Sequence, residues 1–343
     1  MYTLISSNNA LPIPLTFFNS SIFKKNPLLF ILGLMIILGI CFFLAINIGS
    51  IKVSFIQLMK GLFIEYNKDV ASIYQIRFPR VIVTMLVGCA LALSGLLFQV
   101  VLKNPLADPG LIGISAGANI VSLLVGIFLP DLYVFKPMIT CLGGLVTFII
   151  IYSLSWKSGL NTTRIILVGV AIHYTMNAIV SLIESMSASI SSSAGTITLY
   201  SWNDVFLLMI YIVPILIILL FLTQACDLLG LEDRTLLSLG INVNTYRFIL
   251  SLLAVLLCSI SVAIAGILSF VGLLVPHLAR LCVGNQHKYL IPTTALCGAI
   301  IVLVADTIGR TLMAPYEISA GIIMSMIGGP IFILLLKRSL YES

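Results

Sequence analysis

Long apolar runs separated by short polar segments recur throughout this chain of 343 residues. A helix needs about 20 mostly apolar residues to cross the hydrocarbon core of a bilayer. Only 9% of the residues are charged, against roughly a quarter in soluble proteins, so a water-covered surface of this size is excluded. We therefore expect an all-α, multi-pass membrane protein with about ten transmembrane helices. The expected spans are 28–48, 81–102, 111–129, 137–156, 165–183, 205–222, 248–268, 270–283, 290–305 and 318–336.

Several of these runs are shorter than 20 residues or contain glycine and proline, among them Gly113, Gly117, Pro276 and Pro330. Such breaks are tolerated at membrane depth only where neighbouring helices or water satisfy the freed backbone groups. Small residues also let helices approach closely. The pattern indicates a tightly packed bundle around an internal path.

The domain organisation follows from the same runs. We expect residues 1–27 to form a cytoplasmic tail and residues 28–343 a single transmembrane domain. Lys24 and Lys25 precede the first span and favour a cytoplasmic N-terminus, and ten spans then return the C-terminus to the same side. Eleven basic residues fall on the cytoplasmic side and seven on the other, which favours this orientation in the cytoplasmic (inner) membrane.

A leucine-rich polar stretch at 223–247 is the longest interruption on the cytoplasmic side. Gly230 and Gly240 predict two short helices separated by a turn, with Gly240 in a left-handed cap. An amphipathic hairpin could lie on lipid, but Glu232 and Asp233 disfavour an anionic bilayer. We expect this hairpin to dock on a soluble partner.

The chain lacks the motifs of several other function classes. No Walker loop, H-E-x-x-H sequence or C-x-x-C pair occurs, so we expect no catalytic residue, no cofactor and no metal site in this chain. The net charge of +6 is modest and spread out, which does not indicate nucleic-acid binding. An ion-driven transporter would place an acidic group near mid-span, but Asp306 lies four residues before Arg310 and can pair with it.

Three stretches together resemble the permease subunits of type II ATP-binding-cassette (ABC) importers, which take up ferric siderophores, haem and vitamin B12. The first starts with RFPR at 77–80, continues through VIVTMLVGCALALSGLLFQ and reaches NPLADPGLIGISAGA at 104–118. The second is the hairpin at 229–240, with its Ser-Leu-Gly ending. The third comprises GILSFVGLLVPHLAR at 266–280, ADTIGR at 305–310 and EISAGIIMSMIGGPIFILLL at 317–336.

The resemblance implies a fold of ten helices per subunit and an assembly in the membrane lipid. The partners would be a second permease subunit (another copy or a related chain), two cytoplasmic ABC ATPase subunits and an extracytoplasmic substrate-binding protein. The expected function is inward transport of an iron complex, a ferric siderophore or haem, by alternating access. The alternatives are a vitamin B12 permease, an ion-gradient-driven secondary transporter or channel, and a membrane-embedded enzyme.

By the same resemblance, Arg77, Arg80 and Arg310 would dock acidic side chains of the binding protein at the outer face. The planar guanidinium suits this role because it binds a carboxylate through two hydrogen bonds. The alternative for all three is snorkelling to the membrane interface, or for Arg310 the pair with Asp306. The sequence places Arg77 and Arg80 before the second span, with Pro79 ending the outer loop.

Two further groups of residues take their expected roles from the resemblance. Asn104 and Leu106 would belong to a cytoplasmic gate, where a narrow apolar constriction can close a path by excluding water. Glu232, Asp233, Leu239 and Gly240 would belong to the coupling element that sits in a cleft of each ATPase subunit. The driving energy would then come from a partner chain.

Overall fold

The computed structural model describes residues 26–48, 53–63, 68–155, 162–187, 200–313 and 316–342, and every regular element in these ranges is a helix. Seven of the described helices are long and apolar enough to cross a membrane, and three shorter apolar helices join them. These helices match the ten expected spans one for one, which confirms the all-α prediction. They are α2 (Pro27–Asn47), α4 (Lys68–Val101), α5 (Ile114–Phe128), α6 (Lys136–Ser155), α7 (Thr162–Ser187), α8 (Trp202–Phe221), α11 (Val243–Ala265), α12 (Val271–Val283), α13 (His287–Leu312) and α14 (Ala320–Glu342).

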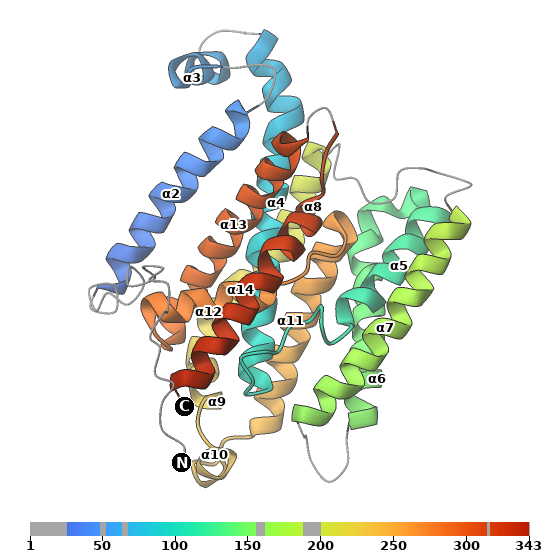
Figure 1. Ribbon diagram of the computed structural model, residues 1–343, viewed down its shortest axis with the longest axis vertical. Coiled ribbons are helices and arrows are strands. Elements are labelled where there is room, and N and C mark those ends of the chain that lie inside the picture. Colours follow the sequence, from blue (N-terminus) through green and yellow to red (C-terminus); the bar gives the residue numbers. More distant parts are fainter. Residues whose placement is uncertain are drawn as a thin grey trace, which may run out of the picture.

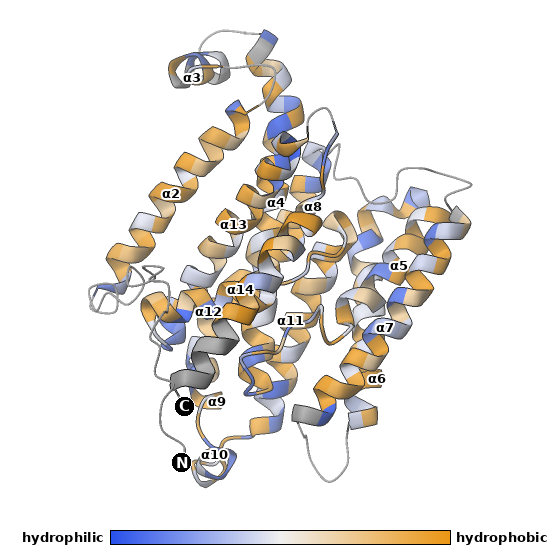
Figure 2. Cartoon of the chain, viewed as in Figure 1, coloured by the Kyte–Doolittle hydropathy of each residue, from blue (hydrophilic) through white to orange (hydrophobic). Residues whose placement is uncertain are grey.

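Helix α4 is the centre of the bundle and the most buried of the long spans. It packs against α11, α12 and α13, while α2 and α7 lie at opposite edges of the molecule in the view of Figure 1. Few of the large apolar side chains of α2 and α7 are buried, as expected of helices that face lipid. Figure 2 shows mostly hydrophobic residues along the spans, with hydrophilic residues near their ends and in a few turns of α5 and α7.

Glycines set the closest approaches of α4 to its neighbours. A Cβ atom on Gly88 would collide with the backbone of Gly298 in α13, and one on Gly95 would collide with the backbone of Gly272 in α12. Small residues at helix interfaces allow this backbone contact, which supplies the packing energy that apolar burial alone does not give in lipid.

Helix α4 begins earlier than the sequence indicates. The expected span starts at residue 81 after an outer loop, but the helix begins at Lys68 and continues through Pro79. Its 34 residues measure roughly 50 Å at ~1.5 Å per residue, more than the hydrocarbon core of about 30 Å. The first turns therefore project beyond the bundle beside α3 (Phe55–Phe63), at the top of Figure 1. Placing Arg77 and Arg80 in a loop was wrong, because the charged turns continue the helix outside the apolar layer.

The stretch expected to form a hairpin does contain two short helices. These are α9 (Thr223–Leu229) and α10 (Asp233–Ser238), and they follow α8 at the opposite end of the bundle from α3. The start of α2 and the end of α14 lie toward the same end as α10 (Figure 1). A 3-10 helix, η2 (Pro130–Phe135), connects α5 and α6. Residues 1–25 of the expected tail lie outside the described residues.

Candidate functional site

A three-way ionic junction joins α10 to the bundle at its lower end in Figure 1. The Lys103 ammonium donates to the Asp233 carboxylate across 2.8 Å, and the Arg247 guanidinium donates to the same oxygen across 3.0 Å. Lys103 follows α4 and Arg247 lies in the first turns of α11, so one carboxylate connects three elements. The hydrogen bond from Lys103 lowers the pKa of Asp233 below its ordinary value, and the charge of Arg247 adds to this effect. Asp233 is therefore ionised at neutral pH.

The residues assigned to a gate lie beside this junction. The Asn104 side-chain oxygen accepts a hydrogen bond from the Leu106 backbone N–H across 2.8 Å, and the Asn104 carbonyl accepts one from Ala107. Helix α4 ends before this turn, at Val101, and Lys103 with its φ of +48° turns the backbone away from the helix axis. The turn at Asn104 then leads the chain towards α5. Leu106 is exposed, and Asn104 is partly exposed. Their position at the end of the bundle is compatible with a gate but does not test it.

A polar cavity of about 590 Å³ opens next to Asn104, between α4, α9, α12 and α13. Arg280 donates to the Gln99 side-chain oxygen, and the Gln99 amide donates to the Gly272 carbonyl. Across the cavity, His287 contacts the Asp227 carboxylate at 2.7 Å. These bonds connect residues 60 to 181 positions apart. These four residues were not predicted as site residues from the sequence. The signal that could have found them is a polar side chain inside an apolar run for Gln99 and Arg280, and next to one for Asp227 and His287.

Helix α10 is anchored on one side and exposed on the other. Leu236 is fully buried, whereas Leu237 and Leu239 are exposed. Glu232 precedes the helix and is also exposed. Gly240 ends the segment with φ of +73°, which confirms the predicted left-handed cap. A short helix that displays leucines outside the apolar layer has the features of a docking element for a soluble partner.

The opposite end of the bundle contains an ionic cluster around Asp306. Arg80 donates to both oxygens of Asp306, at 2.9–3.2 Å, and to Glu317 at 2.8 Å. Arg310 approaches the second Asp306 oxygen at 3.1 Å, which confirms the pairing expected from their i,i+4 spacing. The side chains of Arg80 and Asp306 are 9% and 2% exposed, so the cluster is buried. It ties α4 to α13 and to the segment before α14.

Two arginines of this end also hold the C-terminal end of α2. Arg77 donates to the carbonyl of Ile46 across 2.7 Å, and Arg310 donates to that of Ala45 across 3.3 Å. Cations are favourable partners for the free carbonyl groups of a helix end. The structure thus brings Arg77, Arg80 and Arg310 together, as the docking prediction requires, but all three make internal contacts. Their role in docking stays a prediction.

The model of the FecCD transport family matches residues 36–338. The chain belongs to the FecCD transport family. It is 39% identical over 316 residues to the probable heme-iron transport system permease protein IsdF of Staphylococcus aureus strain MSSA476, a match covering 92% of this chain and 97% of the relative. The relatives in strains MW2 and Newman match with the same identity and coverage.

Solved structures show the same fold. An inward-facing metal-chelate type ABC transporter superposes with a TM-score of 0.76 at 28% identity, covering 90% of this chain and 99% of the other. PsaBC from Streptococcus pneumoniae, in complex with Fab, superposes with a TM-score of 0.53 at 17% identity, covering 82% of this chain and 95% of the other. The FecCD protein described here is thus a multi-pass membrane protein with the fold of an ABC importer permease.

Proposed function

We propose that this FecCD protein is the permease subunit of an ATP-driven importer that moves an iron complex into the cytoplasm, with haem as the first candidate. The observation that carries the proposal is the match over nearly the whole chain to IsdF, which is named a heme-iron transport permease. The similarity to an ABC transporter described as metal-chelate type supports the same class of cargo. Two such permease subunits would enclose the path.

The ATPase subunits would bind the exposed side of α10. Leu237 and Leu239 would enter a groove on the ATPase, and Glu232 and Gly240 would flank the contact. Asp233 has a different position, because its carboxylate points back to Lys103 and Arg247. A movement of α10 would therefore reach α4 and α11 through this carboxylate. Asn104 and Leu106, which follow Lys103, would then respond as the cytoplasmic gate.

The substrate-binding protein would dock at the opposite end, where α3 and the first turns of α4 project. Arg77, Arg80 and Arg310 lie there, as the docking interpretation requires. Because Asp306 and Glu317 already bind Arg80, a carboxylate of the binding protein would have to replace one of them or bind at the rim. Glu317 is the more exposed of the two acids and the easier to displace. With α10 on the cytoplasmic side, both chain termini would be cytoplasmic.

Transport in proteoliposomes tests the proposal. The permease, its ATPase and its binding protein are reconstituted together, and uptake of haem, ferric siderophores and cobalamin is measured with ATP inside. We expect haem or a ferric siderophore to accumulate, and an ATPase variant without its Walker lysine to abolish accumulation. Uptake of cobalamin alone would overturn the iron-complex proposal. Accumulation with the inactive ATPase would overturn the ATP-driven mechanism.

A further inference from the structure

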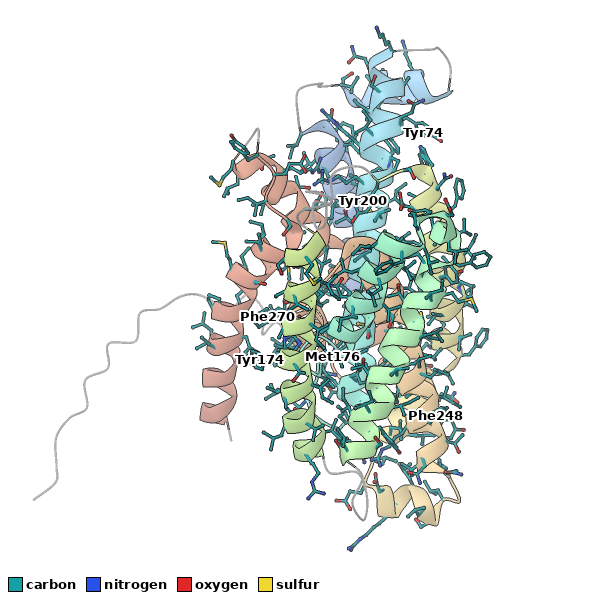
Figure 3. The ribbon with its side chains drawn as sticks, turned by 90° about the vertical axis from the view of Figure 1, so that its right-hand side faces the viewer. Tyr74, Tyr174, Met176, Tyr200, Phe248 and Phe270 are labelled. Carbon is teal, nitrogen blue, oxygen red and sulfur yellow. The ribbon has the colours of Figure 1, made fainter. Side chains whose placement is uncertain are left out.

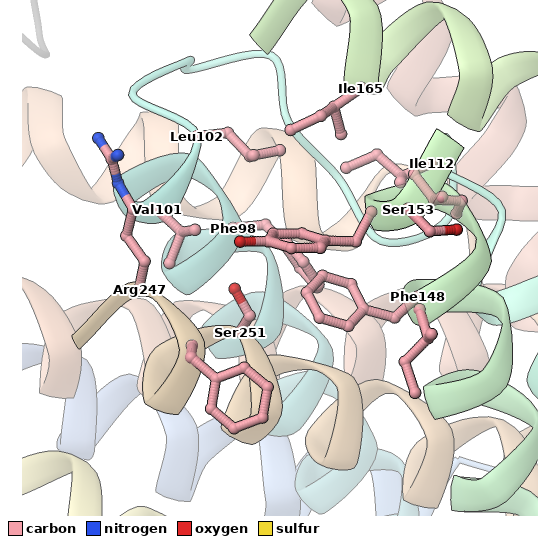
Figure 4. A pocket seen from close by; sticks show the side chains of 13 residues that line it. Phe98, Val101, Leu102, Ile112, Phe148, Ser153, Ile165, Arg247 and Ser251 are labelled. Atoms are coloured by element: carbon pink, nitrogen blue, oxygen red, sulfur yellow. The ribbon is translucent and has the colours of Figure 1, made fainter. Parts of the chain in front are cut away.

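A second cavity, of about 150 Å³, lies inside the bundle near the α10 end and has an almost entirely apolar lining. It lies between α4, α6, α11 and the start of α7 (Figure 4). Its apolar walls include Phe98, Leu102, Ile112, Phe148, Ile165 and Phe248. Tyr152, Ser153 and Ser251 also line it but add little polar surface, so the cavity favours an apolar molecule over water, which needs several polar partners.

The cavity reaches the lipid-facing surface. Ile149 of α6 and Phe248 of α11 line it, and both side chains are largely exposed on helices that span the membrane. Figure 3 shows Phe248 at the edge of the molecule, toward the end that contains α10. Lipid acyl chains are the apolar molecules that surround such a surface, so Ile149 and Phe248 mark the side of the cavity that faces lipid.

A cation lies at the rim of the cavity. Arg247 lines it and uses one terminal nitrogen for Asp233, while its buried Nε atom has no hydrogen-bond partner among the described residues. Arg164 precedes the lining residue Ile165 and adds a second positive charge at the start of α7. Basic pockets between transmembrane helices attract anionic lipid head groups, and guanidinium is well suited to phosphate.

We propose that this cavity binds a segment of one acyl chain of an anionic phospholipid from the leaflet at the α10 end, with the lipid phosphate held by Arg247. The cavity lies next to both cations of the ionic junction, Lys103 and Arg247. Leu102 in its wall directly precedes Lys103, and Arg247 at its rim binds Asp233. The bound lipid thus fills the space behind the junction and stiffens the connection between α4, α10 and α11.

Photolabelling of the purified permease tests this site. The full chain is placed in nanodiscs containing phosphatidylglycerol or phosphatidylcholine, each with a photoreactive group on its acyl chain, and the labelled peptides are identified by mass spectrometry. We expect labelling of residues 149–153 and 247–251, with phosphatidylglycerol preferred. Arg247→Gln should reduce that preference about fivefold, as expected for one cation near an anionic surface. No ATPase or cargo is present, so the result does not depend on the proposed transport function.

Matched variants separate occupancy from general lipid contact. Ser251→Phe fills the cavity and should abolish labelling at 247–251, whereas Ser251→Ala leaves the space open and should keep it. Ile149→Trp enlarges the side chain on the lipid-facing side of the cavity and is the blocking variant if Ser251→Phe does not fold. Leu142→Trp, on an exposed part of α6 away from the cavity, is its control. Labelling that is unchanged in both folded blocking variants would overturn the site. Equal labelling by the two lipids would overturn the role of Arg247.

Discussion

At the scale of single residues, Asp306 is the buried carboxylate on which the outer ionic cluster depends. Its negative charge is shared between the guanidinium groups of Arg80 and Arg310. The uncharged variant Asp306→Asn therefore leaves these buried groups without a full counter-charge. Breaking a buried ion pair from one side costs about 3–5 kcal/mol. We expect a clear decrease in the apparent melting temperature of the detergent-purified permease, followed by the fluorescence of a thiol or tryptophan probe.

Glu317→Gln is the matched control for this prediction. Glu317 also binds Arg80, but its side chain is 35% exposed, so water can replace the lost contact. We expect a much smaller decrease in melting temperature than for Asp306→Asn. Equal effects of the two variants would contradict the view that burial makes Asp306 the centre of the cluster.

Local ion pairs could be predicted from the sequence, whereas ion pairs between distant residues could not. The Asp306–Arg310 pair is local and follows from helical spacing. The contact of Arg80 with Asp306 joins residues 226 positions apart, and nothing in the order of residues specifies it. The same holds for Asp233, which the sequence assigns to the ATPase contact while the structure shows it bound to Lys103 and Arg247.

At the scale of elements, the approach of α4 to α12 depends on having no side chain at Gly95. The Cβ of Gly95→Ala would fall on the backbone of Gly272, which cannot move aside as a flexible side chain could. Overpacking of this kind costs about 1–3 kcal/mol. We expect a lower apparent melting temperature. Gly126→Ala in α5 is the control, because no atom lies near its added Cβ, and it should be neutral or stabilising by up to about 1 kcal/mol.

Helix α10 offers a second element-scale prediction. Leu239 is 61% exposed, so Leu239→Asp removes an apolar contact for the ATPase without disturbing the core. We expect loss of the ATPase during co-purification and an unchanged melting temperature of the permease alone. Leu312→Asp, the same change at an exposed leucine of α13 at the opposite end, should keep the ATPase bound. Retention of the ATPase by Leu239→Asp would refute the assigned coupling surface.

Element boundaries were predictable only where hydropathy changes at the end of a helix. The sequence predicts α12 within one residue, because Gly284 and polar residues end its apolar run. It misses the first 13 residues of α4 (68–80), because a helix that leaves the membrane continues with charged residues and its hydropathy no longer marks it. Pro79 gave a false boundary, since neighbouring elements can support a helix across a proline.

At the scale of the whole molecule, hydropathy predicts the number of spans, whereas the arrangement of those spans depends on contacts between distant residues. The ten apolar runs are each found as a helix in the described part of the chain. The central place of α4 is different, because it depends on backbone approaches such as Gly88 to Gly298. The ionic clusters at the two ends of the bundle also depend on contacts between distant residues. Hydropathy predicts at which end of a span such residues lie, but not which of them pair.

The orientation of the whole molecule can be tested by labelling single introduced cysteines. Ser238 in α10 and Gln75 in the projecting turns of α4 are both exposed and lie at opposite ends of the bundle. The seven native cysteines are buried or half-buried, so a membrane-impermeant maleimide should give a low background with them. In intact cells, Gln75→Cys should react while Ser238→Cys stays protected until the membrane is opened. The reverse pattern would place α10 outside, where no ATP is available, and the proposal of an ATPase-coupled α10 would fail with it.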